Sequence, residues 1–517
     1  MSAADHRRLC GHHGWKELER GCLPAPAQSL TDDDMNAANE LPDAAVKRDA
    51  ARRADARNGA RWARASACVL AVCALLPAGA AADTGPEFAL ARPLPELERE
   101  PPWRAGQPDM IVEVAEFGAR PGDGEDDAPA IRAAIAEAAR HDGLAAVRFE
   151  PGRYDLATAV TPAHVLLPLA DASGLVLDGR GAELIARDPT AGVFRLENAS
   201  DVEVRNFTVD YDPLPWTEGR VVEVDEAAAA FVFEVRAGFP LPSEAYFRDS
   251  LFWGYPIDPR VAGRMKTGAE SASFMDPAVE PLGDRRFRIR FKRNSASHAG
   301  TLEAGDRFVI LARRVRGGLA HAAHSRRITF VNIVSYATVA GHYEGVRTDA
   351  AAILGCRALI RDGRWKGGNA DGVHFRSPRI GPWVEGCEFE GISDDSLVIY
   401  SRPYAIEEVL APRRLRVSRM RFGGGNQNLP VAPGGIQPGD QLAIYDPAVG
   451  LVLATRAVSA FDSGADVVTL ERALPPLEPG GGRARIQIFN RAHGANYVLR
   501  DNALRNSRRY GVYVKAG

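Results

Sequence analysis

The sequence has few cysteines, almost no charge imbalance and no long apolar run, and each shortage excludes a class of protein. Only 6 of the 517 residues are cysteine, and only Cys356 and Cys387 lie beyond residue 82. Two cysteines form no disulfide framework, and no C-x-x-C spacing indicates a zinc site. The formal net charge is −3, which indicates neither a nucleic-acid-binding surface nor a polyanionic protein.

The remaining composition is typical of a large globular chain. Apolar residues make up 45% and charged residues 25%, average values that exclude collagen-like, mucin-like and wholly disordered proteins. The 50 glycines and 35 prolines suit a fold in which turns join many short strands. The length allows three or four ordinary domains or one long repeat architecture.

Residues 1–82 have the pattern of a disordered leader followed by a secretory signal peptide. A basic segment precedes the apolar stretch 65–76, and the small residues 78–82 follow it. The stretch is short for a membrane span and Pro77 interrupts it, although an uncleaved anchor is the alternative. We expect a translation start placed too far upstream and a secreted or periplasmic protein. After removal of the signal we expect no stable membrane insertion.

The next segment predicts a capped solenoid. Strand-like alternation at 111–114 precedes a turn rich in aspartate at 122–127, an amphipathic helix at 128–140 and a strand that ends in P-G-R-Y at 151–154. This order resembles the N-terminal cap of the pectin-lyase-like right-handed β-helix proteins. The helix would cover the open edge of the first coil.

Short alternating strands then recur along the chain. They lie at 202–207, 328–333, 352–356, 383–389 and 497–502. Cys356 follows Asn332 by 24 residues and precedes Cys387 by 31, spacings that fit one coil of a parallel β-helix. This register predicts that the two cysteines are stacked, inward-facing neighbours at a corner where other coils have asparagine. A structural role is favoured over a redox or metal role.

Two stretches break the repeat and show antiparallel alternation. Both contain a related phrase, G-D-R-F-V-I-L at 305–311 and G-D-Q-L-A-I-Y at 439–445. We therefore predict an all-β fold: a right-handed parallel β-helix with an N-terminal capping helix and two inserted small antiparallel β-barrels. The predicted parts are 1–82 leader and signal peptide, 83–211 cap and first coils, 212–316 first barrel, 317–402 central coils with the site, 403–488 second barrel and 489–517 a further coil. The chain ends in mid-pattern, so we expect a truncated reading frame.

Three aspartates predict the chemistry. Aligning Val373 with Leu397 pairs Asp371 with Asp395, which follows it by 24 residues, or one coil. Stacked strands lie about 4.8 Å apart, so Asp371, Asp394 and Asp395 should share one patch. Crowding raises the pKa of at least one carboxyl group, which lets one act as a general acid while another acts as a base. Glycoside hydrolysis needs this division. Calcium binding and ordinary turn roles are the alternatives.

The motif N-A-D-G, followed one coil later by D-D, is similar to the N-T-D-G and D-D motifs of the polygalacturonase family. The wider pattern, with A-D-x-x-H-F before D-D and barrels interrupting the helix, more closely resembles the α-1,3-galactosidases of glycoside hydrolase family 110. The similarity spans about residue 110 to the end. It implies an exo-acting, inverting hydrolase without metal or cofactor, with Asp371, Asp394 and Asp395 as acid–base residues. The G-H-G and R-I-K motifs of polygalacturonases do not follow Asp395.

Six further residues are candidates for substrate binding. His374 has the opposite parity to Val373 and Phe375, so it should face the groove if those two face the core. The others are Trp365 and Lys366 just before the catalytic strand, Glu344 one coil earlier, and Arg508 and Arg509 one coil later. Glu344 is also the reserve acid–base residue. Each of the six has an ordinary packing or surface role as its alternative.

These features favour a secreted glycoside hydrolase that acts on an oligo- or polysaccharide, with α-galactosides as the favoured substrates. A calcium-dependent polysaccharide lyase on the same scaffold, with a lysine or arginine base, is the first alternative. A carbohydrate-binding β-helix without catalysis is the second, because a fold does not establish a function. No nucleic acid partner is expected, and a homo-oligomer is left open.

Overall fold

The computed structural model describes residues 99–270, 272–314, 317–420, 430–432, 434–477 and 486–515. The predicted leader and signal peptide, residues 1–82, lie outside these ranges. Within the described ranges, no helix is both long enough and apolar enough to cross a membrane.

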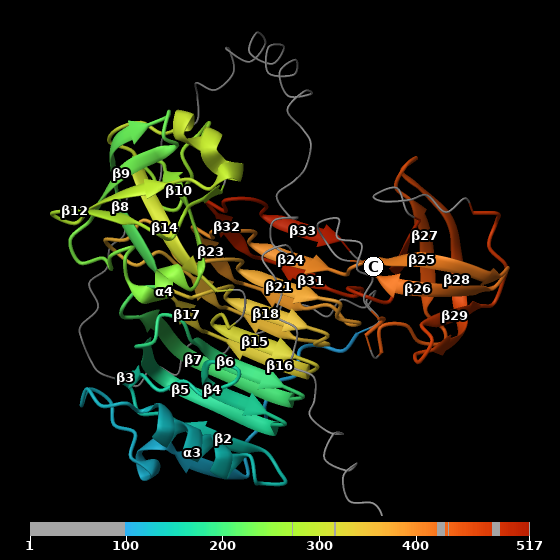
Figure 1. The fold of residues 1–517 in the computed structure, drawn as a ribbon. Helices are drawn as coiled ribbons and strands as arrows, with labels where there is room; N and C mark the ends of the chain where they lie inside the picture. Colours follow the sequence, from blue (N-terminus) through green and yellow to red (C-terminus); the bar gives the residue numbers. More distant parts are fainter. Residues whose placement is uncertain are drawn as a thin grey trace, which may run out of the picture. The chain divides into compact units, whose positions relative to one another are not determined.

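Two parallel sheets form the coils of a β-helix (Figure 1). The larger sheet contains β1 (Met110–Glu113), β2 (Ala145–Arg148), β3 (Arg153–Leu156), β5 (Ser173–Ala186), β7 (Ser200–Tyr211), β16 (Arg326–Val331), β17 (Val334–Ser335), β19 (Ala352–Leu354), β20 (Arg357–Ala358), β22 (Trp383–Glu385), β23 (Glu388–Glu390), β31 (Val498–Arg500) and β32 (Ala503–Arg505). The second sheet contains β4 (Val165–Ala170), β6 (Gly192–Glu197), β15 (Ala320–Ala323), β18 (Tyr343–Val346), β21 (Val373–Arg376), β24 (Leu397–Tyr400) and β33 (Val512–Lys515). The predicted β-helix is confirmed.

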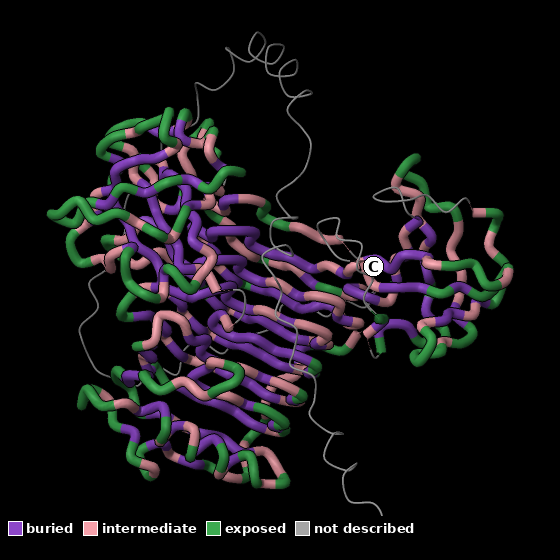
Figure 2. Tube along the Cα trace, in the orientation of Figure 1, coloured by how far each residue is buried: buried purple, intermediate pink, exposed green. Residues whose placement is uncertain are grey.

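Apolar side chains from alternate strand positions fill the space between the sheets. Val373 and Phe375 of β21 are both about 1% exposed, and Phe149 and Phe207 pack edge to face with ring centroids 5.0 Å apart. Figure 2 shows that the coils are largely buried while exposed positions gather at turns and in the insertions. One continuous core therefore holds the coils in register.

The first coil is covered by the predicted helix. Helix α3 (Ala128–Ala138) follows the short 3-10 turn η1 (Val114–Phe117) and packs on β1, β2 and β4. Its buried face includes Ile131 and Ile135, which join the core of the β-helix. The helix thus covers apolar surface that the solenoid would otherwise leave open.

One corner of the coils is built from residues in the left-handed backbone region. The strand register makes Asn206, Asn332, Gly355, Gly386 and Asp501 equivalent, and their φ angles lie between 51° and 64°. Glycine adopts this conformation freely, and asparagine and aspartate adopt it more readily than other residues. The backbone requirement of the turn therefore explains the residue types that recur there.

This corner corrects part of the cysteine prediction. Cys356 and Cys387 are stacked, buried and unpaired, as predicted, and burial raises the pKa of the Cys356 thiol to about 11. The expected alignment with asparagine is wrong by one residue, because Asn332 aligns with Gly355 and Cys356 aligns with Ile333. The positive φ falls on the residue before each cysteine, which leaves the thiols to pack in the core.

The first insertion is an antiparallel sheet with the strand order β11-β10-β14-β8-β9-β13-β12. Its elements are β8 (Trp216–Asp225), β9 (Ala230–Val235), α4 (Ala245–Arg248), β10 (Leu251–Ile257), β11 (Ser273–Phe274), β12 (Glu280–Gly283), β13 (Arg286–Arg290), η2 (Arg293–Thr301) and β14 (Arg307–Arg313). A single isolated bridge between Met275 and Phe291 joins the β11 side to the β13 side, so the predicted barrel closes through much less pairing than expected. Aromatic side chains such as Phe231 and Phe308 fill it.

The second insertion is a closed antiparallel barrel, as predicted. Its strands are β25 (Tyr404–Ala411), β26 (Arg414–Arg419), β27 (Gln441–Asp446), β28 (Leu451–Asp462), β29 (Val467–Leu470) and β30 (Gln487–Asn490). After it the chain returns to the β-helix, where β33 pairs with β24 in parallel. The coil that begins with β24 is therefore completed by residues more than a hundred positions later in the chain.

The corner geometry gives the first prediction. Gly355→Val should lower the free energy of unfolding by about 2 kcal/mol, because a side chain in the left-handed region is strained and a β-branched one more so. Gly355→Asn is the matched control and should change it by less than about 0.5 kcal/mol, since Asn332 already occupies the equivalent position. Urea unfolding measures both, and equal losses would contradict this explanation of the corner.

Candidate active site

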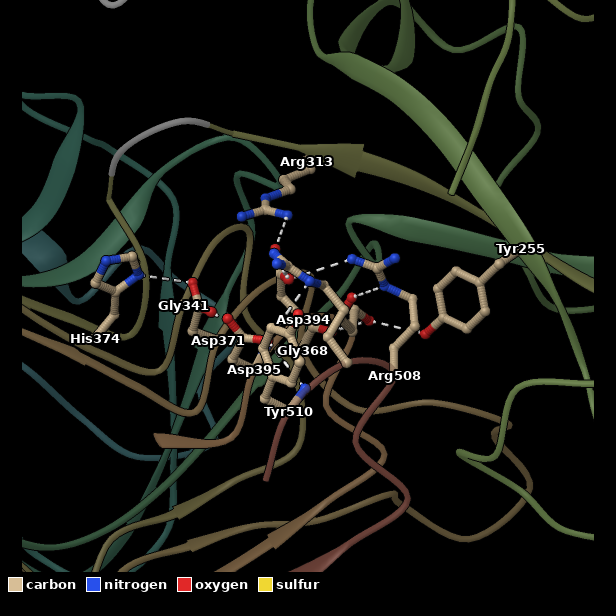
Figure 3. Close-up of polar contacts among 12 residues, drawn as sticks. Tyr255, Arg313, Gly341, Gly368, Asp371, His374, Asp394, Asp395, Arg508 and Tyr510 are labelled. Carbon is tan, nitrogen blue, oxygen red and sulfur yellow. Dashed lines mark hydrogen bonds and ion pairs between the residues drawn. The ribbon is translucent and has the colours of Figure 1, made fainter. Parts of the chain in front are cut away.

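The register of β21 and β24 brings the three aspartates together. Val373 pairs with Leu397, and the Gly372 amide donates to the Asp395 carbonyl oxygen over 3.0 Å. One carboxylate oxygen from each of Asp371, Asp394 and Asp395 lies within 4.8 Å of the others. All three residues are buried, and Figure 3 shows their side chains meeting at the starts of these strands.

Asp394 is surrounded by arginines. Its Oδ2 accepts from Arg313 over 2.8 Å, while its Oδ1 accepts from Arg508 over 3.2 Å and from Arg509 over 3.0 Å. Burial alone would raise the pKa of this carboxyl group, but the three positive charges outweigh it and hold the pKa below its ordinary value. Asp394 is therefore the fixed negative charge of the trio.

The arginines come from distant parts of the chain. Arg313 ends β14 of the first insertion, whereas Arg508 and Arg509 belong to the coil that follows the second barrel. The Arg508 guanidinium lies 4.7 Å from the ring centroid of Trp253 in β10. The Tyr255 hydroxyl, on the same strand, lies 3.1 Å from the Ser393 hydroxyl. The first insertion thus supplies part of the site.

Asp395 has the opposite electrostatic environment. Burial, together with the charge of Asp394, raises its pKa to about 6, although Arg509 and the Tyr510 amide act in the other direction. The Tyr510 N–H donates to Oδ1 of Asp395 over 3.0 Å. Two adjacent carboxyl groups consequently differ in protonation in mildly acidic solution, below the pKa of about 6 of Asp395, because arginines surround Asp394 much more closely.

Asp371 lies one coil away and contacts His374. The Asp395 amide donates to its Oδ1 over 3.2 Å, and His374 Nδ1 lies 2.9 Å from its Oδ2. Since a carboxylate only accepts, Nδ1 carries the proton of this bond. His374 is half-buried on the outward face of β21, as its parity predicts, and its ring centroid lies 5.2 Å from that of Tyr400.

Glu344 lies beside this pair but takes no part in it. It is the register partner of His374 on β18, and its Oε1 accepts from the Gly341 amide over 3.3 Å. Burial raises its pKa, with a smaller opposing effect from the charges of His374 and Arg376. The residue is placed to reach a ligand that lies against His374.

Lys366 lies beneath the site instead of lining it. It is fully buried, and its Nζ donates to the Gly368 carbonyl over 2.7 Å and to Asn369 Oδ1 over 2.9 Å. It also lies 4.2 Å from the ring centroid of Trp216. Burial lowers its pKa well below the ordinary value. These contacts fix the loop that leads to Asp371, and they count against direct contact with a substrate.

Trp365 is also part of this support. Two guanidinium groups lie against its ring, that of Arg236 at 4.4 Å from the centroid and that of Arg307 at 5.0 Å. Its amide donates to Oε1 of the buried Glu218 over 2.8 Å. The indole is 9% exposed, which leaves little surface on which a sugar ring could stack.

Sequence reasoning missed four residues that shape the site: Tyr255 and Arg313 of the first insertion, Ser393 and Tyr510. One signal could have found Arg313. The last strand of an insertion must return to the coil that it left, so charged residues at its end lie near the neighbouring coils.

A separate cavity of about 730 Å³ lies elsewhere, where β7 meets the first insertion. Its lining includes Asp210, Phe239, Tyr246, Arg361 and Arg364. None of the nine predicted site residues lines it. We assign the candidate active site to the aspartates because acid–base chemistry requires carboxyl groups in unlike environments, which the trio supplies.

Three clustered carboxylates are also a donor set that Ca²⁺ accepts. Both oxygens of Asp394, however, already accept hydrogen bonds from guanidinium groups, and these groups would repel a cation. A proton on Asp395 removes further negative charge. The donor set therefore fits a calcium ion poorly.

Comparison with known proteins confirms the predicted resemblance to α-1,3-galactosidases. The chain is 25% identical to alpha-1,3-galactosidase B of Akkermansia muciniphila over 430 residues, which cover 78% of this chain and 52% of that protein. It is 22% identical to alpha-1,3-galactosidase B of Bacteroides thetaiotaomicron over 364 residues, which cover 60% of this chain and 54% of that protein. The chain thus spans about half the length of these curated relatives.

No family model matches the sequence. Among solved structures, the exopolygalacturonase of Thermotoga maritima aligns with a TM-score of 0.28 at 15% identity, covering 58% of this chain and 57% of that one.

Proposed function

We propose that this protein is a glycoside hydrolase that releases α-linked galactose from a glycan. The observation that carries the proposal is the unequal pair of neighbouring carboxyl groups, Asp394 held ionised by three arginines and Asp395 with its pKa raised to about 6. The similarity to proteins named α-1,3-galactosidases favours galactose and a 1,3-linkage.

Asp395 is the proposed general acid. A carboxyl group with a pKa of about 6 holds a proton in mildly acidic solution and transfers it to the glycosidic oxygen as the bond to the anomeric carbon breaks. The leaving sugar departs as a neutral alcohol.

Asp371 is the proposed base. One of its oxygens accepts a proton from water while the water oxygen forms the new bond to the anomeric carbon. His374 donates to the other oxygen and so orients the carboxylate. The second ring nitrogen of His374 is buried and has no hydrogen-bond partner among the described residues.

We propose that the hydrolase acts outside the cytoplasm without a metal ion. The signal-like pattern of residues 65–82 supports export. The guanidinium groups around Asp394 support metal independence, and they disfavour a calcium-dependent lyase at this site. A chelator should leave turnover unchanged, whereas a lyase would lose it and would give an unsaturated, ultraviolet-absorbing product.

The acid and base assignments predict the effect of two substitutions. Asp395→Asn and Asp371→Asn should each lower kcat on an α-1,3-linked galactobioside by about 10²- to 10⁴-fold, because each removes one proton-transfer step. Asp501→Asn is the matched control, since Asp501 is exposed at a corner where other coils have asparagine. Unchanged turnover in both active-site variants would exclude the assignment and leave a non-catalytic carbohydrate-binding β-helix as the better account.

The pKa of Asp395 predicts the pH profile. Since the general acid must be protonated, kcat/KM should fall as pH rises through about 6. Arg509 lowers that pKa, so Arg509→Gln should move the alkaline limb to higher pH. Arg505→Gln, which removes an exposed arginine that pairs with Glu388, should leave the limb in place. A shift to lower pH in Arg509→Gln would contradict the assignment of the acid.

The stereochemistry of the product forms a separate prediction. The resemblance implies inversion, and proton NMR of the first-formed sugar should show β-galactose from an α-galactoside. Inverting enzymes usually separate the two carboxyl groups by about 6.5–9.5 Å, whereas the nearest oxygens here lie within 4.8 Å. Inversion therefore requires the carboxyl groups of Asp371 and Asp395 to lie farther apart in the substrate complex than their nearest oxygens do in this structure. First-formed α-galactose would instead make Asp371 a nucleophile.

A further inference from the structure

A group of arginines lies beyond the aspartates, where the second sheet meets the second barrel. Arg376 ends β21, Arg347 directly follows β18, and the Arg347 amide donates to the Arg376 carbonyl over 2.9 Å. Arg402 follows β24, and Arg419 at the end of β26 is the register partner of Tyr404. We call Arg347, Arg376, Arg402 and Arg419 the arginine cluster.

The cluster lies on the same face of the sheet as the proposed catalytic groups. Arg376 is two residues after His374 on β21, so both side chains leave the strand on its outward face. Two residues of a strand span about 6.6 Å, which is close to the length of one sugar unit. A glycan that extends from the aspartates along this strand would reach the cluster with its next sugars.

Three members of the cluster, Arg347, Arg376 and Arg419, have little compensating negative charge among the described residues. All four arginines are half-buried, and among the ion pairs found within the described residues none includes Arg347, Arg376 or Arg419. The Nε atom of Arg419 is buried without a hydrogen-bond partner in the same ranges. The nearby carboxylate of Glu344 is influenced by Arg376 but accepts its hydrogen bond from Gly341.

Such clustering costs free energy in the absence of an anion. Burial lowers the pKa of the Arg419 guanidinium, and the charges of Arg402, Arg347 and Arg376 lower it further. Most other half-buried arginines near this sheet have a carboxylate partner, as Arg195 has Glu197 at 3.0 Å. Guanidinium groups bind sulfate and carboxylate through paired hydrogen bonds, so an anionic ligand would remove the repulsion.

We propose that the arginine cluster is a subsite for an anionic substituent, a sulfate ester or a carboxylate, carried by the part of the glycan next to the galactose that is cleaved. The proposal rests on the proposed hydrolase function for the orientation of the glycan, and it makes acidic galactans the substrate class. The anion would bind between β21 and the second barrel, which would give that barrel a role in substrate selection.

Binding to the full-length Asp395→Asn protein tests the subsite without turnover. Isothermal titration would compare a sulfated galacto-oligosaccharide, the same oligosaccharide after desulfation, and one that carries a uronate. The sulfated or the uronate compound should bind at least tenfold more tightly than the neutral one, and the stronger of the two identifies the anion. Arg376→Gln and Arg419→Gln would each be added to the Asp395→Asn protein. Each should weaken binding of the preferred anionic oligosaccharide about tenfold and leave binding of the neutral oligosaccharide unchanged.

Arg195→Gln is the matched control, because Arg195 lies on the outward face of the same sheet but is paired with Glu197. It should leave all three affinities unchanged. Equal affinity for anionic and neutral compounds, or no binding of any, would overturn the subsite. The same titrations at 4 °C with the wild-type protein check that the Asp395→Asn substitution does not itself cause either result. If the wild-type protein binds the anionic compound selectively but hydrolyses no α-galactoside, the subsite stands and the proposed hydrolase function fails.

Discussion

Burying three carboxyl groups side by side is unfavourable unless positive charge compensates them, and the candidate active site depends on how the fold supplies that charge. Three guanidinium groups converge on Asp394. Its neighbour Asp395 has a longer ion pair, with Arg509 Nε 3.7 Å from its Oδ1, and its pKa is raised. The same repulsion that would destabilise three equal carboxylates thereby places a proton on one of them. One distribution of charge therefore accounts for both the burial of the trio and its proposed acid–base function.

The two insertions make this distribution possible. A coil without insertions has only the side chains of its own strands and turns. The aspartates lie on adjacent coils, just before strands β21 and β24 of the second sheet. The first insertion supplies Arg313, which donates to Asp394, and Tyr255, whose hydroxyl contacts that of Ser393. The second insertion lies in the sequence between β24 and the coil that carries Arg508 and Arg509, yet β24 still pairs in register with β33 of that coil. The β-helix therefore fixes the spacing of the aspartates, and the segments inserted between its coils allow arginines from distant parts of the chain to reach them.

Regular features of the site could be predicted from the sequence, because they follow from the period of the coil. The pairing of Asp371 with Asp395 and the outward direction of His374 needed only strand alternation and a coil length. The position of Arg313 at the end of the last strand of an insertion indicates only that it lies near the neighbouring coils. Its contact with Asp394 could not be predicted, since it depends on the tertiary path of an irregular insertion. Lys366 looked like a groove residue from its sequence position, yet buried carbonyl groups surround it. Similarly, the predicted alignment of the cysteines with asparagine was wrong by one residue. The corner is defined by a positive φ angle, which falls on the residue before each cysteine and cannot be recognised from residue types alone.

The central claim is that the proton of the trio resides on Asp395 and that Asp394 stays ionised. Neutron diffraction from crystals of the deuterium-exchanged protein at about pH 5 would locate that proton directly, since this pH lies below the pKa of about 6. The account predicts deuterium on a carboxyl oxygen of Asp395, none on Asp394, and arginine donors directed at both Asp394 oxygens. Deuterium on Asp394 together with an ionised Asp395 would contradict it.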